Sequence, residues 1–107
     1  MMAIALFCAA CAAQLREGVR VAKDGVYFQL RRPAAISVSI AGDFNNWSQD
    51  AHPMRRSGDF WTSVVPLPPG DYAFMYLVNG MEWVTPPNAM ELVPDVYGSM
   101  NGKVSVP

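Results

Sequence analysis

The sequence contains few charged residues and shows no concentration of basic ones. Charged residues make up 16% of its 107 residues, and the formal net charge is −1. Nucleic acids and anionic membrane surfaces are bound through clustered lysines and arginines. The composition therefore favours a neutral ligand or a protein partner, and we expect no nucleic-acid partner.

The sequence also lacks the motifs of common catalytic and metal-binding sites. It has no G-x-S-x-G, H-E-x-x-H or phosphate-binding loop pattern. Its one histidine, His52, lies in a turn-like Asp-Ala-His-Pro segment without a sequence partner for base catalysis. No pair of carboxylates is marked for glycoside hydrolysis, because they are scattered through turns. These include Asp24, Asp43, Asp59 and Asp71. The chain is predicted not to be an enzyme and to use no metal ion or cofactor.

Cysteine is scarce, and both cysteines lie in an apolar N-terminal segment. Cys8 and Cys11 have the C-x-x-C spacing of a redox or metal pair, but no second C-x-x-C and no nearby histidine accompany them. We therefore interpret them as structural residues. A bacterial lipoprotein signal ending at Cys11 is an alternative, although Cys8 stands where a leucine is usual.

Residues 1–13 (MMAIALFCAACAA) are apolar and uncharged. A helix needs about 20 apolar residues to span a bilayer, so this segment better matches the central region of a signal peptide. Small residues at 10–13 would allow cleavage, whereas the missing basic region would fit an upstream start or a non-secreted N-terminus. We expect export to the periplasm, envelope or medium, with a cytoplasmic location as the alternative. No membrane contact is expected beyond the signal or a lipid anchor.

No stretch shows a sustained 3.6-residue period, and short β-prone runs alternate with turns instead. The runs are residues 19–21, 26–30, 36–40, 60–65, 71–77 and 103–106. Asp24-Gly25 and Asn79-Gly80 predict hairpin turns, and residues 88–93 could form one helical turn. Strands with turns at this spacing predict an all-β fold, an antiparallel β-sandwich. We expect a short linker at residues 14–18 and one domain at residues 19–107.

Two of the three tryptophans lie beside polar turns. Residues 41–47 (AGDFNNW) lead from a β-prone run through turn-forming residues to Trp47, and we expect Phe44 to point inward. Most tryptophans are buried, but the polar residues around Trp47 favour a loop edge. Trp83 follows the second predicted hairpin turn, whereas Trp61 lies in mid-strand and is predicted to pack in the core. A neutral glucan presents C–H-rich ring faces, so the two turn-associated indoles suit stacking on sugar if their loops meet.

The order of these motifs resembles carbohydrate-binding module family 48. The resemblance covers residues 20–107 and rests on VSIAGDFNNW, Met54-Arg55-Arg56, Phe60-Trp61 and PGDYAFMYLVNGMEW. That family includes the glycogen-binding domain of the AMP-activated protein kinase β subunit and the N-terminal domains of isoamylases and glycogen branching enzymes. The resemblance implies an immunoglobulin-like β-sandwich of the E-set type that binds α-glucans.

The resemblance also implies which residues bind sugar. Trp47 matches the stacking tryptophan of the family's G-x-F-N-x-W, and Trp83 matches the second one, after the V-[DN]-G hairpin. The sequence YGSMN near the C-terminus resembles the family's Leu-Gly-Thr-x-Asn. There the bulky residue packs through the sugar ring while the hydroxyl and the amide bond its oxygens. The resemblance therefore assigns these roles to Tyr97, Ser99 and Asn101.

One position of the candidate site departs from the kinase-type pattern. Met75 stands where that domain has a sugar-contacting lysine. The departure removes a charge-assisted donor, which affects affinity or glycogen preference, and stacking on Tyr97 would compensate in part. The leading hypothesis is non-catalytic binding of α-1,4-glucans such as glycogen, starch or maltooligosaccharides.

Two alternatives stay open. The domain could be a protein-interaction or envelope module, with methionines near the same loops forming an adaptable apolar patch. These are Met75, Met81, Met90 and Met100. It could also be an accessory domain that works with a glycoside hydrolase family 13 type enzyme, whose catalytic barrel another chain would supply.

Overall fold

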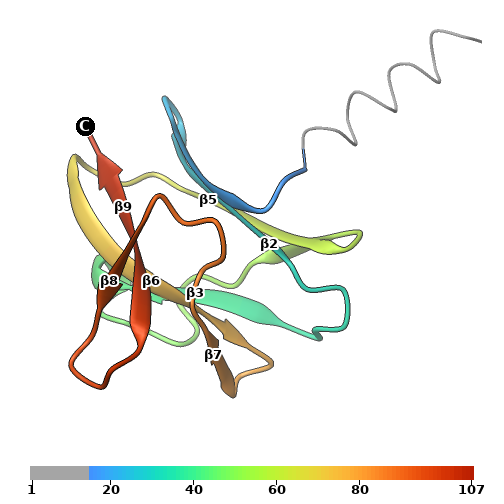
Figure 1. Ribbon diagram of the computed structural model, residues 1–107. Helices are drawn as coiled ribbons and strands as arrows, with labels where there is room; N and C mark the ends of the chain where they lie inside the picture. The colour runs from blue at the N-terminus through green and yellow to red at the C-terminus, as the bar shows by residue number, and fades with distance from the viewer. Residues whose placement is uncertain (1–14) are drawn as a thin grey trace, which may run out of the picture.

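The computed structural model describes residues 15–107 and shows two antiparallel β-sheets that share one core (Figure 1). The strands are β1 (Gly18–Ala22), β2 (Gly25–Arg31), β3 (Val38–Gly42), β4 (Arg55–Ser57), β5 (Phe60–Val65), β6 (Gly70–Val78), β7 (Glu82–Val84), β8 (Glu91–Pro94) and β9 (Met100–Val106), with a 3-10 turn η1 (Asp43–Asn45) after β3. The predicted all-β, immunoglobulin-like antiparallel sandwich is confirmed. The predictions for Cys8, Cys11 and the signal segment lie outside the described residues.

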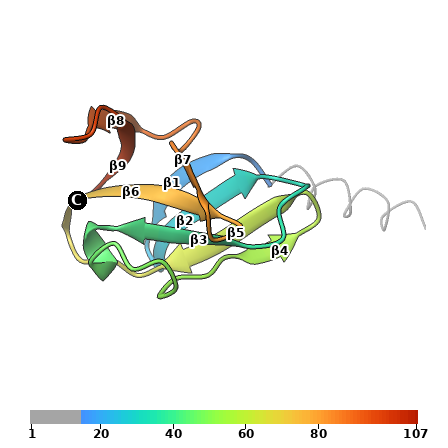
Figure 2. The same cartoon turned by 90° about the horizontal axis from the view of Figure 1, so that it is seen from below.

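Strand β6 is the centre of the second sheet. The first sheet has the order β1-β2-β5-β4, and the second has the order β3-β6-β9-β8, with β7 also paired to β6. Figure 2 shows β3 on one side of β6, and β9 with β8 on the other. Residues 76–78 of β6 pair with β7, and residues 70–74 pair with β9. Strands β7 and β9 therefore follow one another along the same edge of β6.

Alternate side chains of the central strands fill the core between the sheets. Those from β2 and β6 are Val26, Phe28, Leu30, Phe74, Tyr76 and Val78. The rings of Phe74 and Phe28 pack edge to face with their centroids 5.1 Å apart. Burial, with a smaller effect of Glu17, raises the pKa of Tyr76. Because successive strand residues face opposite sides, Met75 and Leu77 lie on the outer face of the second sheet.

Trp61 packs in the core, as predicted. Its side chain is buried, and its Nε1–H donates to the carbonyl oxygen of Arg32 at 3.0 Å. A buried indole needs a partner for its N–H group, and this bond supplies it. Trp61 is therefore a core residue, unlike Trp47 and Trp83, which follow polar turns.

The prediction of a strand over residues 36–40 is wrong at its start. Ile36 is 85% exposed and lies outside β3, which begins two residues later. The backbone N–H groups of Ile36 and Ser37 donate instead to Oδ1 of Asn79, at 2.7 and 3.2 Å. Asn79 lies in the turn between β6 and β7, so a distant residue decides where β3 starts.

The C-terminal part also differs from the prediction. Residues 91–94 form β8 rather than part of a helical turn, and β9 begins at Met100 rather than at residue 103. Gly102 interrupts the alternation of side chains that would have predicted the start of β9. A Cβ at this position would lie 2.8 Å from Cγ of Pro86, so the packing there needs glycine.

The short edge strand β4 is also missing from the prediction, and β1 already includes Gly18 of the predicted linker. Within residues 15–107, no helix has the length and apolar character to cross a bilayer.

Candidate functional site

The loop after β3 holds Trp47 in an unusual backbone conformation. Asn46 and Trp47 have φ angles of 55° and 57°, in the left-handed region. Asparagine tolerates this region, whereas a bulky aromatic residue rarely adopts it. The N–H of Trp47 donates to the carbonyl oxygen of Gly42 at 2.9 Å, which closes the loop after η1. The predicted turn is confirmed, and the loop structure holds Trp47 against its backbone preference.

The side chain of Asn45 organises this loop. Its Oδ1 accepts hydrogen bonds from the N–H groups of Gly42 and Ser48, at 3.0 and 3.2 Å. Its Nδ2 group donates to the carbonyl oxygen of Ile40 at 3.0 Å and lies 2.8 Å from Nδ1 of His52. His52 also packs edge to face against Phe44. The only histidine of the sequence therefore supports the loop, and Phe44 packs against the core, as expected.

Asp43 fixes the indole of Trp47 to the second sheet. Its Oδ1 accepts a hydrogen bond from Nε1 of Trp47 at 3.1 Å, and its Oδ2 accepts one from the N–H of Ala73 at 2.8 Å. Ala73 belongs to β6, so one carboxylate joins the loop tryptophan to the central strand.

Replacing Asp43 with alanine is expected to lower the free energy of unfolding by about 1 kcal/mol, because both hydrogen bonds are lost near the surface. Urea denaturation of wild type and variant measures the difference. Asp59→Ala is the matched control, because the Asp59 carboxylate forms an exposed ion pair with Arg31, and such pairs contribute little to stability. Equal effects of the two substitutions would contradict the anchoring role of Asp43.

Trp83 reaches the same outer face from β7. It pairs with Leu77 of β6 across the sheet, and 42% of its surface is exposed. Met75, two residues before Leu77, is 8% exposed. It lies on β6 between the residues that pair with β7 and those that pair with β9. On the other edge of β6, Met75 pairs with Ala41 of β3. The sequence prediction that Trp83 lies just beyond a hairpin tip is confirmed.

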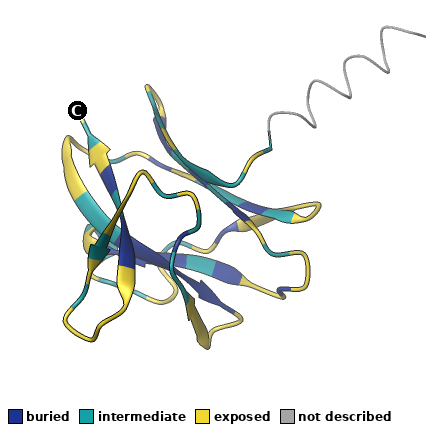
Figure 3. Ribbon diagram, viewed as in Figure 1, coloured by how far each residue is buried: buried dark blue, intermediate teal, exposed yellow. Residues whose placement is uncertain are grey.

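The loop between β8 and β9 adds three of the predicted residues. Tyr97 is 90% exposed and Ser99 is exposed, while Asn101 is 8% exposed and pairs with Val93 of β8. Figure 3 shows this loop as a largely exposed segment that joins the two strands. Asn101 thus belongs to strand β9 itself, with Tyr97 and Ser99 in the loop that precedes it.

Asp95, which the sequence analysis did not single out, closes this loop. Its Oδ1 accepts hydrogen bonds from the N–H groups of Tyr97 and Ser99, at 2.8 and 2.9 Å. Its own N–H donates to the carbonyl oxygen of Ser99 at 2.9 Å, and Gly98 has a φ of 88°. An aspartate three residues before a glycine is a known turn signal, and it could have drawn attention to this position.

These segments enclose one open cleft of about 430 Å³ on the outer face of the second sheet. Its lining contains the six predicted residues and Asp95: Trp47, Met75, Trp83, Asp95, Tyr97, Ser99 and Asn101. Three aromatic side chains, one amide, two hydroxyls and one carboxylate therefore meet over a buried methionine. No lysine, arginine or histidine is among these lining residues. The cleft can offer flat apolar surfaces and a few hydrogen-bonding groups.

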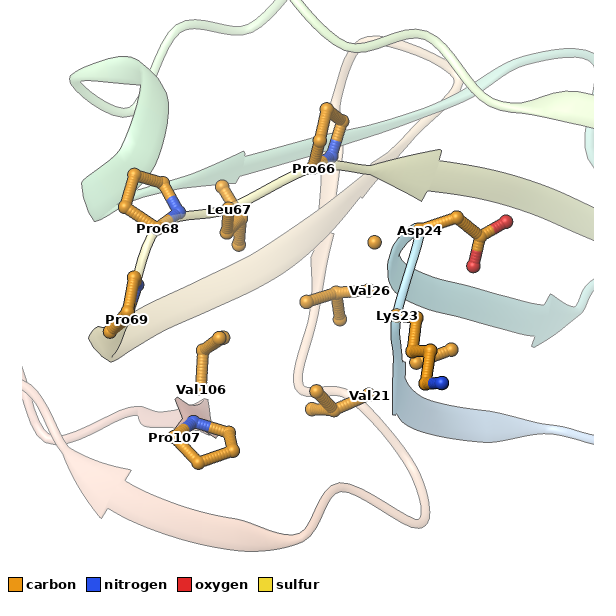
Figure 4. Close-up of a pocket in the computed structure, with 12 residues that line it drawn as sticks. Val21, Lys23, Asp24, Val26, Pro66, Leu67, Pro68, Pro69, Val106 and Pro107 are labelled. Atoms are coloured by element: carbon orange, nitrogen blue, oxygen red, sulfur yellow. The ribbon is translucent and has the colours of Figure 1, made fainter.

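A larger pocket of about 510 Å³ has a different chemistry. It lies between the β1–β2 turn, the proline-rich segment before β6 and the chain's last residues (Figure 4). Its lining is mostly aliphatic and proline side chains, such as Val21, Leu67, Pro68 and Val106, and it includes no aromatic ring. Within residues 15–107 no group of three His, Cys, Asp or Glu side chains is arranged to hold a metal ion. The aromatic cleft is therefore the better candidate for ligand binding.

Comparison with known proteins identifies a family and a group of relatives. The family model of carbohydrate-binding module 48, described as the isoamylase N-terminal domain, matches residues 16–89. A 1,4-alpha-glucan branching enzyme of Pseudomonas putida is 32% identical over 90 residues, which are 77% of this chain and 12% of that enzyme. One from Salinibacter ruber is 33% identical over 91 residues, 81% of this chain and 15% of the enzyme. The chain thus spans only a small part of the length of these relatives. The family match includes Trp47, Met75 and Trp83, whereas the loop with Tyr97 and Ser99 lies beyond it.

Proposed function

The chain belongs to the carbohydrate-binding module 48 family, and from this premise we propose that it binds α-1,4-glucans without acting on them chemically. Pyranose rings stack on Trp47 and Trp83, while Ser99 and Asn101 exchange hydrogen bonds with sugar hydroxyls. The observation that carries this proposal is the meeting of three aromatic side chains with an amide in one open cleft. Residues far apart in the sequence build this surface on one sheet.

The chemistry of the cleft fits a neutral glucan. Pyranose faces are apolar and flat, and indole rings provide a large contact area at a low cost in side-chain entropy. Met75 extends the apolar surface between Trp83 and Asn101, where a lysine would have supplied a charge. Tyr97 adds a third ring from an exposed loop. Binding therefore depends on stacking more than on charge.

A non-catalytic role fits the carboxylates of the cleft. Glycoside hydrolysis uses two carboxyl groups on either side of the scissile bond, about 5 to 9.5 Å apart. Asp95 is the one carboxylate among the residues that line the cleft. Because similar sequences occur within 1,4-alpha-glucan branching enzymes, we propose that the domain holds a glucan for an enzyme of glycoside hydrolase family 13 type.

Titration with maltoheptaose and β-cyclodextrin tests the proposal. We expect saturable binding with a change in tryptophan fluorescence, because two of the three indoles line the cleft while Trp61 lies in the core. Trp47→Ala and Trp83→Ala are each expected to weaken binding by about 1 to 3 kcal/mol, as for aromatic hot spots. Isothermal titration calorimetry measures the variants, because they have lost part of the fluorescence signal.

Two controls make this test specific. Val64→Ala removes a 46% exposed side chain of β5, in the other sheet, and should leave the affinity unchanged. Cellohexaose, with β-1,4 links, tests whether the cleft requires the curvature of an α-glucan. If the folded wild-type protein gives no response at millimolar sugar, the proposal fails. A protein partner at the exposed methionines, such as Met81 and Met90, would then be the next hypothesis.

A further inference from the structure

We propose that Asp95 sets the specificity of the cleft, favouring uncharged glucans over glucans that carry phosphate esters. This inference rests on the proposed function and names the substrate class of the same cleft. Asp95 is the only charged residue among those that line the cleft. It therefore supplies the formal charge within the cleft that a bound sugar meets.

The nearby cation on the same sheet is already paired. Lys103 lies on β9, and its Nζ is 3.7 Å from Oδ2 of Asp71 and 3.6 Å from Oε1 of Glu91. Two carboxylates thus compensate this one ammonium group. On the other side of the cleft, Asp43 holds the indole of Trp47 and adds a further negative charge. The surroundings of Asp95 are therefore acidic.

The two oxygens of Asp95 are used differently. Both loop hydrogen bonds, from the N–H groups of Tyr97 and Ser99, end on Oδ1. Among the hydrogen bonds found within residues 15–107, none ends on Oδ2. The carboxylate therefore orders the loop through one oxygen and has the other for sugar hydroxyls, which donate hydrogen bonds. A phosphate ester is an acceptor with negative charge, so the same group repels it.

The size of this discrimination follows from Coulomb's law. A phosphate monoester about 5 Å from a carboxylate in a water-exposed cleft meets a repulsion that corresponds to about a three- to tenfold loss of affinity. The repulsion is expected to shrink at high ionic strength, because exposed charges are screened. Stacking on Trp47 and Trp83 does not depend on salt in this way.

The test compares maltoheptaose with a maltoheptaose that carries one phosphate monoester, by calorimetry at low and high ionic strength. The wild-type protein should prefer the unphosphorylated sugar by about three- to tenfold at low salt. Asp95→Asn retains an oxygen for the two loop N–H groups but removes the charge. It should bind maltoheptaose more weakly than wild type, because a donor NH2 group replaces the acceptor Oδ2, and it should lose most of the preference between the two sugars. Asp95→Ala should weaken both sugars, because the loop loses its anchor.

The outcomes separate this inference from the proposed function. Asp59→Asn makes the same change in net charge on the other sheet, and it should keep the wild-type preference. If wild type and Asp95→Asn bind maltoheptaose but show the same ratio between the two sugars, the inference is wrong while the proposed function stands. If the folded wild-type protein binds neither sugar, both fail.

Discussion

Replacing Phe74 with alanine is expected to lower the free energy of unfolding by about 3 to 5 kcal/mol. The ring is fully buried and contacts Phe28 and Tyr76 edge to face, with centroids 5.1 and 5.7 Å away. It also lies against Gly102, whose missing side chain leaves room for it. The substitution removes these contacts at the centre of β6, and the surrounding strands cannot close the cavity. Because a small domain has only about 5 to 15 kcal/mol of stability, much of it is lost.

Urea denaturation, followed by far-ultraviolet circular dichroism and by tryptophan fluorescence, to which the buried Trp61 contributes, measures this loss. Met81→Ala is the control, because Met81 is 82% exposed in the turn before β7 and its removal should change stability by no more than about 0.5 kcal/mol. Phe74→Leu should lie between the two. A loss below about 1 kcal/mol for Phe74→Ala would mean that the two sheets do not depend on this ring for their packing.

Local patterns in the sequence predict most of the sandwich. The hairpin turn at Asn79 and the strands on either side of it follow from the turn chemistry and from β-prone runs, and the structure confirms them. The last strand was predicted only from residue 103, and its first residues, 100–102, were missed because small and polar residues there obscure the alternation. The true start of β3 depends on Asn79, a residue more than 40 positions away. Such long-range contacts leave no local signal.

In the candidate site too, local sequence predicts some features, and others depend on long-range contacts. Trp47 and Trp83 stand out because each follows a polar turn, but only the strand order explains why they meet. Strands β7 and β9 share one edge of β6, so Trp83 and Asn101 approach from neighbouring positions, with Met75 between them. Asp95 was missed because an aspartate in a loop is an ordinary turn residue. Its two hydrogen bonds to the loop become visible only in three dimensions.

Gly42 connects the fold with the candidate site, because it ends β3 and begins the loop of Trp47. Its N–H donates to Oδ1 of Asn45, and its carbonyl oxygen accepts from the N–H of Trp47. It also pairs with Phe74 across the sheet. A Cβ at this position would lie 2.5 Å from the carbonyl oxygen of Ala73 and 2.8 Å from Cβ of Phe74. Strand β3 can approach β6 this closely only with glycine at position 42.

Gly42→Ala is therefore expected to lower the free energy of unfolding by about 3 kcal/mol, because the new methyl group meets backbone that cannot move without breaking strand pairing. It should also weaken glucan binding, since any shift of Gly42 moves the hydrogen bonds that hold Asn45 and Trp47.

Gly58→Ala is the matched control. Gly58 has a φ of 62°, and an added Cβ would meet open space, so alanine there costs only about 1 kcal/mol of backbone strain and leaves binding unchanged. Chemical denaturation and calorimetry with maltoheptaose measure both quantities. If Gly42→Ala lost stability but kept wild-type affinity, the loop of Trp47 would be independent of the sheet edge, and the coupling argued from these hydrogen bonds would be wrong.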